Sequence, residues 1–530
     1  MRSDRCLIFQ RDRTVLVATG AAIYPEARDG IRQFAELVHA AGAYHTYRVT
    51  ELALWSAAAG GMTADEIVAF LERYGEHPPP LTLVAFIQEV IGRYGLLRLT
   101  GPLGGLRLMG PDRGLLARVA EAHGLAWDGD ALVVPDAQRG AIKRALAEEG
   151  YPVVDEAVLA ASAPVSFTLR PEVRLRPYQA EAMRRFLERA VTGGVVLLPC
   201  GAGKTVVGVA IAAALQSATL IVTPSRTIGE QWQRHLREMT TLPPDAVGEY
   251  VAGREPPPVT VVTYQRLTAR ADGRQATLGA LLDWPWGLVI YDEVHALPAE
   301  IFRQSASLQS RRRLGLTATL VREDGRERDV FSLVGPTVFS VPWRDLERRG
   351  WIAPVDCVEV RVRPPGSGAA SADRILAAKL RVVRRLARRH AGEPTLVVAH
   401  RLTEVAAAAR ALGAPMVTGQ TPAAERRALY DAFRRGEIRC LALSRVANVG
   451  VDLPDAAVLI QISGAFGSRQ EEAQRLGRLL RPKGSGRRAV FYTLVVPGTR
   501  EVEFAARRQR FLVDQGYRYR VVEAEGSAGS

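Results

Sequence analysis

The sequence contains little cysteine, very little lysine and no long apolar run. Its four cysteines, Cys6, Cys200, Cys357 and Cys440, are far apart and form no CxxC pair. Zinc sites and iron–sulfur clusters need clustered thiolates, so neither is expected, and reduced, buried thiols are the simplest interpretation. No apolar run reaches the roughly 18 residues that a membrane-spanning helix needs, which argues against a membrane protein.

The N-terminal segment shows no sign of a targeting signal. Met1–Arg5 includes an acidic residue and is followed by no long apolar stretch. A signal peptide needs a basic start and an apolar centre. We therefore expect a cytoplasmic protein.

Lysine occurs at only four positions, Lys143, Lys204, Lys379 and Lys483, although Lys and Arg together number 70 and the net charge is +14. A strongly basic chain favours a polyanionic partner, because each cation that meets a phosphate releases a counterion. The excess of arginine and alanine is also typical of a GC-rich coding bias. Charge alone therefore leaves a nucleic-acid partner and an ordinary solvated surface equally open.

Hydropathy patterns divide the N-terminal third of the chain into two parts. Residues 1–95 begin with a short strand-like run and continue with helical patterns, one of which opens with a capping box at Thr63 and Glu66. Residues 96–165 contain two alternating apolar runs around a Gly-Gly pair, followed by helix, strand and helix patterns. These features predict a mainly helical N-terminal domain and a small α/β domain.

The remaining two thirds of the chain alternate short, wholly apolar runs with helical patterns. Strands this apolar are buried on both faces, as in parallel sheets. We therefore predict two tandem parallel-sheet α/β lobes, at 166–350 and 376–530, joined by a flexible connector within 351–375. The predicted strands include Val195–Leu198, Leu220–Val222, Val259–Val262, Leu288–Tyr291, Leu396–Val398, Leu441–Leu443, Val458–Ile462 and Val490–Leu494.

A glycine-rich loop follows the first predicted strand of this region and opens a helix. Its residues are Gly201, Ala202, Gly203, Lys204 and Thr205. The backbone N–H groups of such a loop cradle phosphates, and the positive end of the helix adds to the attraction. Lys204 would bind the β- and γ-phosphates of ATP, and Thr205 would ligate Mg²⁺. The first glycine of the strict pattern is missing, so an ordinary glycine-rich turn is the alternative.

Two acidic residues, Asp292 and Glu293, end the apolar run that finishes at Tyr291. Asp292 would hold Mg²⁺ through water, and Glu293 would orient the attacking water as general base. Charged strand ends are common. An Asp-Glu-Val-His tetrad that follows a buried strand and lies downstream of a phosphate-binding loop is much less so. ATP and Mg²⁺ are therefore the expected cofactors.

Two more segments complete the predicted ATP site. Arg176 and Gln179 precede the loop, and a Gln amide can both donate to and accept from an adenine edge. In the second lobe, Gln474, Arg478 and Arg481 share one helix face by their spacing. Arginines delivered across a cleft to a γ-phosphate stabilise the charge of the transition state, whereas a solvated basic helix is the alternative.

These motifs, taken in order, resemble those of superfamily 2 helicases. The resemblance implies that the two lobes are RecA-like, and it adds roles that spacing alone does not supply. The residues that match positions coupling hydrolysis to lobe movement in similar chains are His295, Thr317, Thr319, Asn448, Gly450, Asp452 and Gln474. The residues at positions where the family contacts nucleic acid are Arg226, Thr263 and Tyr264.

Finer features resemble the XPB family of DNA-repair helicases. The triplet Arg322, Glu323 and Asp324 follows a Thr-Ala-Thr motif, as it does in XPB-like proteins. In that family the triplet is associated with opening duplex DNA. A plain salt-bridged loop is the alternative.

The resemblance covers most of the chain, with one departure. It is strong over residues 165–520, while residues 1–95 resemble the N-terminal domain of bacterial XPB-like helicases. Residues 96–165 occupy the place of the family's small damage-recognition domain. XPB proteins usually carry a helical thumb before the second lobe, but only about a dozen residues separate Val362 from Ile375. The thumb is therefore expected to be reduced or absent, which bears on any strand gripping.

The resemblance implies an ATP-dependent 3′-to-5′ DNA helicase or duplex translocase that serves DNA repair, with the polarity taken from the family alone. An RNA helicase or a nuclease-linked translocase is a second possibility. A third is an ATP-switched clamp that remodels DNA without processive unwinding, which the reduced thumb favours. The expected partners are duplex or forked DNA and a nuclease or repair complex, and no membrane. The expected location is the cytoplasm, in association with the nucleoid.

Overall fold

The computed structural model describes most of the chain. The described residues are 5–41, 43–157, 162, 164–188, 193–199, 201–269, 276–282, 284–296, 308, 310–318, 327–341, 343–366, 370–444, 456–463, 479, 488–514, 517 and 519–524. The chain divides into two compact units, Met1–Leu197 with Lys204–Ser340, and Val341–Ser530 with the loop Leu198–Gly203. Among the described residues, no helix is long and apolar enough to span a membrane.

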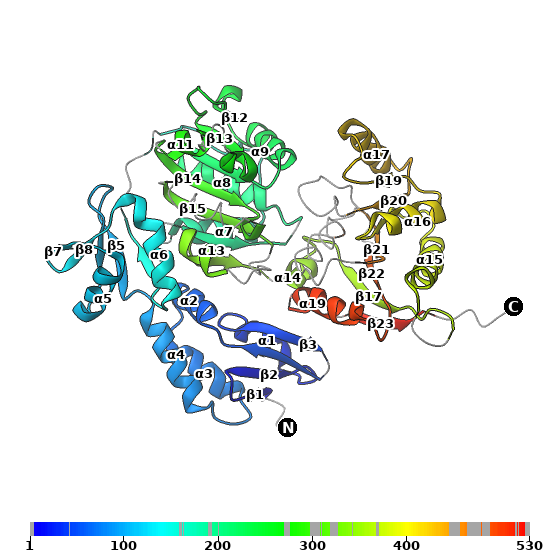
Figure 1. Cartoon of the computed structure of the whole chain (residues 1–530), viewed down its shortest axis with the longest axis horizontal. Helices are drawn as coiled ribbons and strands as arrows, with labels where there is room; N and C mark the ends of the chain where they lie inside the picture. Colours follow the sequence, from blue (N-terminus) through cyan, green and yellow to red (C-terminus); the bar gives the residue numbers. More distant parts are fainter. Residues whose placement is uncertain are drawn as a thin grey trace. The chain divides into compact units, whose positions relative to one another are not determined.

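The N-terminal part of the first unit combines an antiparallel sheet with four helices (Figure 1). In sheet order the strands are β1 (Leu7–Phe9), β2 (Thr14–Ala18), β4 (Tyr44–Arg48) and β3 (Glu36–Ala41). The helices are α1 (Tyr24–Ile31), α2 (Glu51–Ala59), α3 (Ala64–Tyr74) and α4 (Leu81–Arg93). The predicted capping box is confirmed: the Glu66 N–H donates to the Thr63 hydroxyl, and the Thr63 N–H donates to the Glu66 carboxylate. The sheet is larger than the single predicted strand, because its other strands are short and partly polar.

The next part is a small five-stranded sheet with two helices. In sheet order the strands are β7 (Trp127–Asp128), β8 (Ala131–Val133), β6 (Arg107–Met109), β5 (Leu97–Thr100) and β9 (Val153–Asp155). The helices are α5 (Arg113–His123) and α6 (Arg139–Glu148), with a 3-10 turn η1 (Asp136–Gln138) before α6. The hairpin predicted around the Gly-Gly pair is confirmed, since β5 and β6 are antiparallel with Leu99 opposite Leu108.

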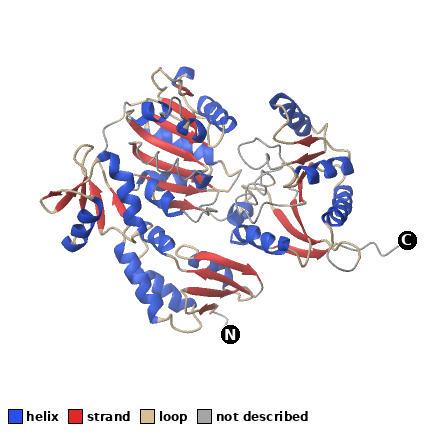
Figure 2. Cartoon of the chain, viewed as in Figure 1, coloured by secondary structure: helices blue, strands red, loops and turns tan. Residues whose placement is uncertain are grey.

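The first lobe is a seven-stranded, wholly parallel sheet. In sheet order its strands are β12 (Val247–Glu249), β13 (Val259–Thr263), β11 (Thr219–Thr223), β14 (Trp286–Asp292), β15 (Ser310–Thr317), β10 (Gly193–Leu197) and β16 (Thr337–Ser340). The helices are α7 (Pro177–Glu188), α8 (Lys204–Leu215), α9 (Arg226–Met239), α10 (Tyr264–Thr268), α11 (Ala276–Leu282) and α13 (Glu327–Leu333), with the 3-10 turns η2 (Pro244–Ala246) and η3 (Val294–Ala296). Every residue of β11 and β14 is buried, because helices cover both faces of the sheet (Figure 2).

The second unit is built around another seven-stranded parallel sheet. In sheet order its strands are β19 (Met416–Val417), β20 (Cys440–Leu443), β18 (Thr395–Val398), β21 (Val458–Gln461), β22 (Ala489–Val495), β17 (Val355–Arg361) and β23 (Tyr519–Glu523). The helices are α14 (Trp343–Arg348), α15 (Ala372–Arg389), α16 (Leu402–Leu412), α17 (Ala423–Arg435) and α19 (Arg500–Asp514). The predicted fold class, two parallel-sheet α/β lobes, is confirmed.

One of the four lysines, Lys379 of α15, lies in the interior of the second unit. It is 2% exposed, and its ammonium donates to the Ile462 carbonyl at 2.9 Å and to the Glu501 carboxylate at 2.7 Å. A buried ammonium is stable only when it is paired in this way. The interaction ties α15 to α19 and to the end of β21. Between β17 and α15, the described residues 362–366 and 370–371 contain no helix or strand. The reduced thumb and the domain boundaries at 95, 165, 350 and 375 remain predictions.

The N-terminal part packs on α13 of the first lobe. Phe331 of α13 is 9% exposed and lies in the N-terminal hydrophobic core, with its ring centroid 5.7 Å from that of Trp55 and 6.5 Å from that of Tyr94. Beside it, the Arg328 guanidinium lies 2.7 Å from the Glu51 carboxylate. The same helix therefore belongs to the packing of two sheets that are far apart in sequence.

The small domain also packs on α13, through its helix α6. Next to that contact, Asp155 accepts hydrogen bonds from Arg139 and Lys143, each with a nitrogen 2.8 Å away. Burial acts to raise the pKa of Asp155, but the two adjacent cations hold it well below its usual range. A buried carboxylate must be paired in this way, so these charges fix where α6 lies against β9.

We expect Phe331→Ala to loosen the N-terminal part from the first lobe. Removing a buried aromatic ring usually costs about 3–5 kcal/mol, and this ring belongs to the contact between the two parts. The variant should unfold at lower urea concentration, and limited proteolysis should release an N-terminal fragment sooner. Leu81→Ala is the control, because Leu81 is 86% exposed. Equal proteolysis of both variants and the wild type would contradict the assigned contact.

Candidate ATP site and nucleic-acid edge

The candidate ATP site lies at the carboxyl ends of three neighbouring strands of the first lobe. β14, β15 and β10 are adjacent in the sheet, and their registers pair Asp292 with Leu316 and Leu197 with Thr317. Ligands of open parallel sheets bind outside the carboxyl ends of the strands. The sheet therefore places the acidic end of β14 close to the end of β15 and to the point where the glycine-rich loop begins.

Two glycines shape the loop between β10 and α8. Gly201 and Gly203 have φ angles of +80° and +82°, a region that residues with a Cβ rarely adopt. Ala202, between them, is buried, and its N–H donates to the Pro199 carbonyl at 3.1 Å. α8 then begins at Lys204, with Thr205 in its first turn. The left-handed φ angles of both glycines are compatible with the predicted phosphate-binding loop.

Lys204, the buried Asp292 at the end of β14 and the partly buried Glu293 form a charged group. The Lys204 ammonium lies 3.2 Å from the Glu293 carboxylate. Asp292 is 5% exposed, and burial, followed by the negative charge of Glu293, raises the pKa of Asp292 to about 6. Glu293 has a φ of +51°, a costly conformation for a residue with a side chain and one that occurs at functional sites. Two carboxylates therefore share one lysine in a medium that disfavours charge.

This group suits Mg²⁺ and a nucleotide phosphate. The carboxylate of Asp292 and the hydroxyl of Thr205 are oxygen ligands of the type that Mg²⁺ prefers. A second positive charge beside Asp292 would offset the repulsion between the two carboxylates that raises its pKa. The donor set and the charge balance both fit the predicted metal.

His295, predicted as a coupling residue, joins the ends of β14 and β15. Its side chain is 1% exposed, its Nδ1 is hydrogen-bonded to the hydroxyl of Thr317, and the same nitrogen lies 3.5 Å from the Glu293 carboxylate. Thr317 is fully buried at the end of β15. The structure therefore brings together two of the predicted coupling residues and connects them to the predicted general base.

Two aromatic residues support Asp292. The indole N–H of Trp232, in α9, donates to an Asp292 carboxylate oxygen at 2.8 Å. A Cβ added to Gly208 of α8 would lie 2.4 Å from the Trp232 ring, so the glycine makes room for it. In the sequence, Trp232 is one apolar residue of an amphipathic helix, and nothing local distinguishes it from an ordinary core residue.

Tyr264 is the second support. Tyr264 is 4% exposed, and its hydroxyl donates to the backbone carbonyl of Asp292 at 2.6 Å. Its polar tip holds the end of β14, as buried tyrosines usually find a hydrogen-bond partner. Its predicted role as a nucleic-acid contact stays a prediction.

The predicted adenine-reading residues lie at the start of α7, which packs against α8. Gln179 is 4% exposed, and its side-chain oxygen accepts the Arg176 N–H at 2.9 Å. The Arg176 guanidinium donates to the Tyr178 hydroxyl at 3.2 Å. This local network fixes the Gln179 amide at the helix that neighbours the phosphate-loop helix.

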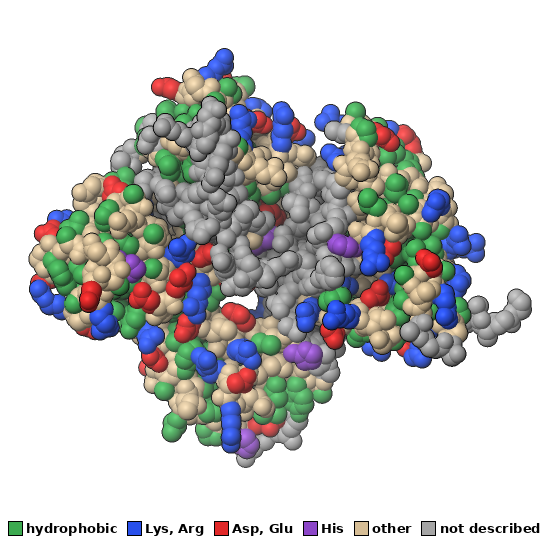
Figure 3. All heavy atoms as spheres, viewed as in Figure 1, with side chains coloured by type: hydrophobic (Ala, Val, Ile, Leu, Met, Phe, Trp, Pro, Cys, Tyr) green, Lys and Arg blue, Asp and Glu red, His purple; other side chains and the backbone are tan. Residues whose placement is uncertain are grey.

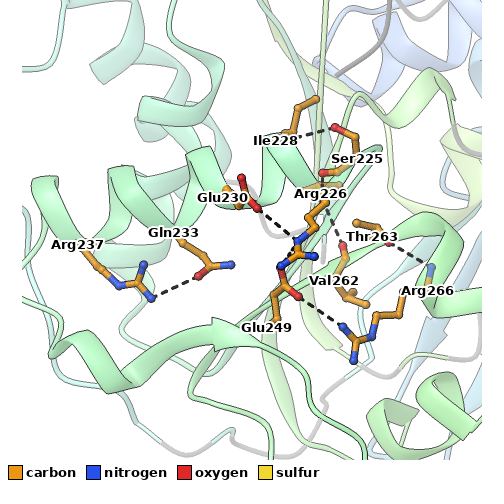
Figure 4. Close-up of polar contacts among 11 residues, drawn as sticks. Ser225, Arg226, Ile228, Glu230, Gln233, Arg237, Glu249, Val262, Thr263 and Arg266 are labelled. Atoms are coloured by element: carbon orange, nitrogen blue, oxygen red, sulfur yellow. Dashed lines mark hydrogen bonds and ion pairs between the residues drawn. The ribbon is translucent and has the colours of Figure 1, made fainter. Parts of the chain in front are cut away.

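Two exposed arginines lie where β11 and β13 end, on the same side of the sheet as the candidate ATP site (Figure 4). Arg226 begins α9 directly after β11, and Thr263 ends β13, where it accepts the Arg266 N–H at 3.2 Å. The register pairs Thr223 with Thr263, so both helices start side by side. Arg266, which sequence reasoning missed, lies two positions after a residue that it identified. The side chains of Arg226 and Arg266 are 77% and 43% exposed.

The net positive charge does not by itself mark a surface. Figure 3 shows Lys and Arg side chains on the visible face interspersed with Asp and Glu side chains over the described residues. Arg226 and Arg266, called the arginine edge from here on, are therefore identified by their position at the strand ends. The predicted site residues that lie outside the described residues are Thr319, Arg322, Glu323, Asp324, Asn448, Gly450, Asp452, Gln474, Arg478 and Arg481.

The fold and the site define a two-lobed helicase-type ATPase. Three family models match in order: "Helicase conserved C-terminal domain" at residues 7–126, "Type III restriction enzyme, res subunit" at 172–322, and "ERCC3/RAD25/XPB C-terminal helicase" at 375–528. A solved structure of the "ATP-dependent Type ISP restriction-modification enzyme LlaBIII bound to DNA" shares the fold. Its TM-score is 0.51 at 14% identity, over 67% of this chain and 31% of that one.

Full-length relatives identify the family. The "DNA 3'-5' helicase XPB" of Mycobacterium tuberculosis is 45% identical over 99% of this chain and 99% of its own. The protein of the same name from Kineococcus radiotolerans is 44% identical over 99% of this chain and 98% of its own. The chain therefore belongs to the XPB helicase family and is an ATP-dependent enzyme.

We expect Asp292→Asn to change how stability depends on pH. Because the pKa of Asp292 is raised to about 6, the folded state holds this proton more tightly than the unfolded chain, whose value is near 4. The wild type therefore loses stability as pH rises towards and through 6, and the variant does not. Between pH 5 and pH 7 the free energy of unfolding of the variant should gain about 1 kcal/mol relative to the wild type. Urea unfolding in EDTA without nucleotide measures it, and parallel pH profiles would refute the assignment.

We expect Trp232→Phe to lower ATP turnover although the ring is kept. The change removes one hydrogen bond to Asp292, and loss of such supporting bonds typically costs about 10- to 100-fold in metal affinity or activity. The Mg²⁺ concentration at half-maximal ATPase rate should rise. Trp284→Phe, the same replacement at a half-buried residue away from Asp292, is the control. If both variants behave alike, Trp232 is only a packing residue.

Proposed function

We propose that this protein is an ATP-dependent 3′-to-5′ DNA helicase or duplex-DNA translocase of the XPB type that acts in DNA repair. The observation that carries the proposal is the charged group of Lys204, Asp292 and Glu293 at the strand ends of the first lobe, in which Asp292 is buried. The full-length similarity to proteins named as DNA 3'-5' helicases supports DNA as the substrate and supports the polarity.

The proposed reaction is transfer of the γ-phosphoryl group of ATP to water, with Mg²⁺ neutralising the phosphate charge. Lys204 would bind the β- and γ-phosphates, and Asp292 and Thr205 would hold the metal. Glu293 would orient the attacking water and accept its proton. Lys204 and Glu293 lie 3.2 Å apart, so each neutralises the charge of the other when ATP is absent. Once the phosphates of ATP bind Lys204, the Glu293 carboxylate would become available as the base.

The second lobe is proposed to complete the site. Arg478 and Arg481 would stabilise charge on the γ-phosphate, and Gln474 would sense the nucleotide, as the family pattern implies. The hydrogen bond between His295 and Thr317 supports a role in passing the state of the site to β15. Thr319, Asn448, Gly450 and Asp452 are further coupling positions by the same pattern.

DNA is proposed to track along the arginine edge of the first lobe. Arg226 begins α9 and Arg266 lies in the short helix α10, and both side chains are exposed, which suits contacts to phosphates rather than to base edges. The triplet Arg322, Glu323 and Asp324 is proposed to act where strands separate. A nuclease or repair complex is the proposed protein partner.

The short connector between β17 and α15 favours one alternative, an ATP-switched clamp that remodels DNA without unwinding it. A clamp and a helicase would share the ATP site. They differ in whether hydrolysis separates strands, so a single set of assays distinguishes them.

The function is tested by ATPase rates without nucleic acid and with duplex DNA, single-stranded DNA or RNA, together with displacement of 3′-tailed and 5′-tailed duplexes. We expect DNA but not RNA to raise the rate, and only the 3′-tailed duplex to be displaced. Lys204→Ala should lower turnover by at least about 100-fold, which assigns the activity to this site.

Other outcomes decide between the alternatives. Stimulation by DNA without displacement would support the clamp or a translocase. Preferential stimulation by RNA would establish an RNA helicase. Wild-type turnover in Lys204→Ala would contradict the site assignment itself.

A further inference from the structure

A small hollow lies between the two arginines of the arginine edge, Arg226 and Arg266. Its volume is about 120 Å³, and it is lined by Arg226, Gly229, Glu249, Val261, Val262, Thr263 and Arg266. The walls are the start of α9, the ends of β12 and β13 and the start of α10 (Figure 4). All the ionisable residues of this lining except Glu249 are arginines.

The Glu249 carboxylate connects the two arginines. One of its oxygens lies 3.7 Å from Arg226 Nε, and the other lies 3.4 Å from Arg266 Nη1. Arg226 is also paired with Glu230 of α9 at 3.3 Å, but no contact joins Glu230 to Arg266 among the described residues. Glu249 is therefore an anion placed between cations that belong to two different helices, α9 and α10.

The position of Glu249 follows from the sheet. It is the last residue of β12, the edge strand, and the register pairs it with Val261 of β13. Because β13 ends two residues later at Thr263, the Glu249 side chain is level with the start of α10. A carboxylate at the end of this edge strand is thus held where a strand of nucleic acid would pass.

The pairs that Glu249 makes are weak enough to exchange. The side chains are 33% to 77% exposed, and exposed ion pairs contribute little, because solvent and salt screen them. An arginine that meets a phosphate can instead form two parallel, charge-assisted hydrogen bonds. A phosphodiester would therefore displace the carboxylate, but the displaced charge would stay within one Debye length of it and repel it.

We propose that Glu249 is an internal competitor for one DNA backbone phosphate, held between Arg226 and Arg266 when DNA is absent. The inference rests on the proposed function and specifies how the nucleic-acid edge of that function is regulated. The carboxylate pre-orients both guanidinium groups and weakens their hold on each phosphate. A motor must release one phosphate before it binds the next, so weaker binding of each phosphate favours its movement along DNA.

Glu249→Gln tests the inference, because it keeps the shape and removes the charge. Binding is measured by fluorescence anisotropy of a labelled 30-base-pair duplex and a labelled dT30 strand, without nucleotide, in about 100 mM KCl. We expect dissociation constants about 3- to 10-fold lower than in the wild type, the effect of removing one like charge beside a phosphate. The gain should shrink at about 300 mM KCl, where the charge is screened more strongly.

Glu238→Gln is the matched control. It changes the net charge equally, and it lies 12 residues after Arg226 in the same helix, about 18 Å along its axis. Its effect should be within about 1.5-fold of the wild type. In an Arg226→Ala background, the gain from Glu249→Gln should fall by at least half, because one of the two released arginines is absent.

The outcomes separate the inference from the function on which it rests. Equal gains from Glu249→Gln and Glu238→Gln would show a general charge effect and overturn the inference. If the wild type binds DNA and Glu249→Gln binds it no more tightly, the inference is overturned as well, but the proposed function is not. If the wild-type protein binds neither DNA probe, both the proposed function and the inference fail.

Discussion

Two adjacent carboxylates, one buried and one partly buried, lie beside one lysine and are the constraint on which the ATP site of the first lobe depends. Asp292 ends a strand that is buried along its whole length, and Glu293 follows it; charge in such surroundings is tolerated only when it is paired and hydrogen-bonded. Lys204 compensates one carboxylate. The pKa of Asp292, raised to about 6, shows that the compensation is incomplete. Burying these charges destabilises the free protein, but it strengthens the binding of a cation and a phosphate that would balance them.

The residues that hydrogen-bond to Asp292 come from α9 and α10, the helices that carry the proposed DNA contacts. α9 starts with Arg226 and carries Trp232, which donates to the Asp292 carboxylate. α10 starts with Tyr264, which donates to the Asp292 carbonyl, and it also carries Arg266. A DNA strand that displaced either helix would therefore change the hydrogen bonds of Asp292. The candidate ATP site and the two arginines are connected because α9 and α10 carry residues of both.

The sequence predicts the parts of this protein whose causes are local. The buried strands of both lobes are recognisable because a strand covered on both faces is wholly apolar, and the capping box at Thr63 is recognisable because its chemistry lies within four residues. Strands such as β12, β16 and β23 escape prediction. They are short or lie at the edges of sheets, where half-exposed, mixed residues suffice. The site residues near glycine-rich and acidic motifs are found, because ATP chemistry requires those residue types at those spacings.

The supporting residues are not predictable in this way. Trp232 and Tyr264 reach Asp292 across 60 and 28 positions of sequence, and their local patterns are those of core residues. Glu249 and Arg266 meet because β12 ends beside β13, two residues before β13 ends and α10 begins. Phe331 packs into a core built almost entirely from residues 6–90. Each depends on the order of strands or on the packing of one part on another, which no single-sequence pattern contains.

We propose that Asp292 links nucleotide binding to DNA binding through Trp232 and Tyr264. The most direct measurement is the dissociation constant for duplex DNA with and without a non-hydrolysable ATP analogue and Mg²⁺, in the wild type and in Tyr264→Phe. We expect a nucleotide-dependent change of at least about 5-fold in the wild type, a typical coupling between sites, and a ratio near one in the variant. Affinity for DNA that does not respond to nucleotide, or an equal response in the variant, would contradict it.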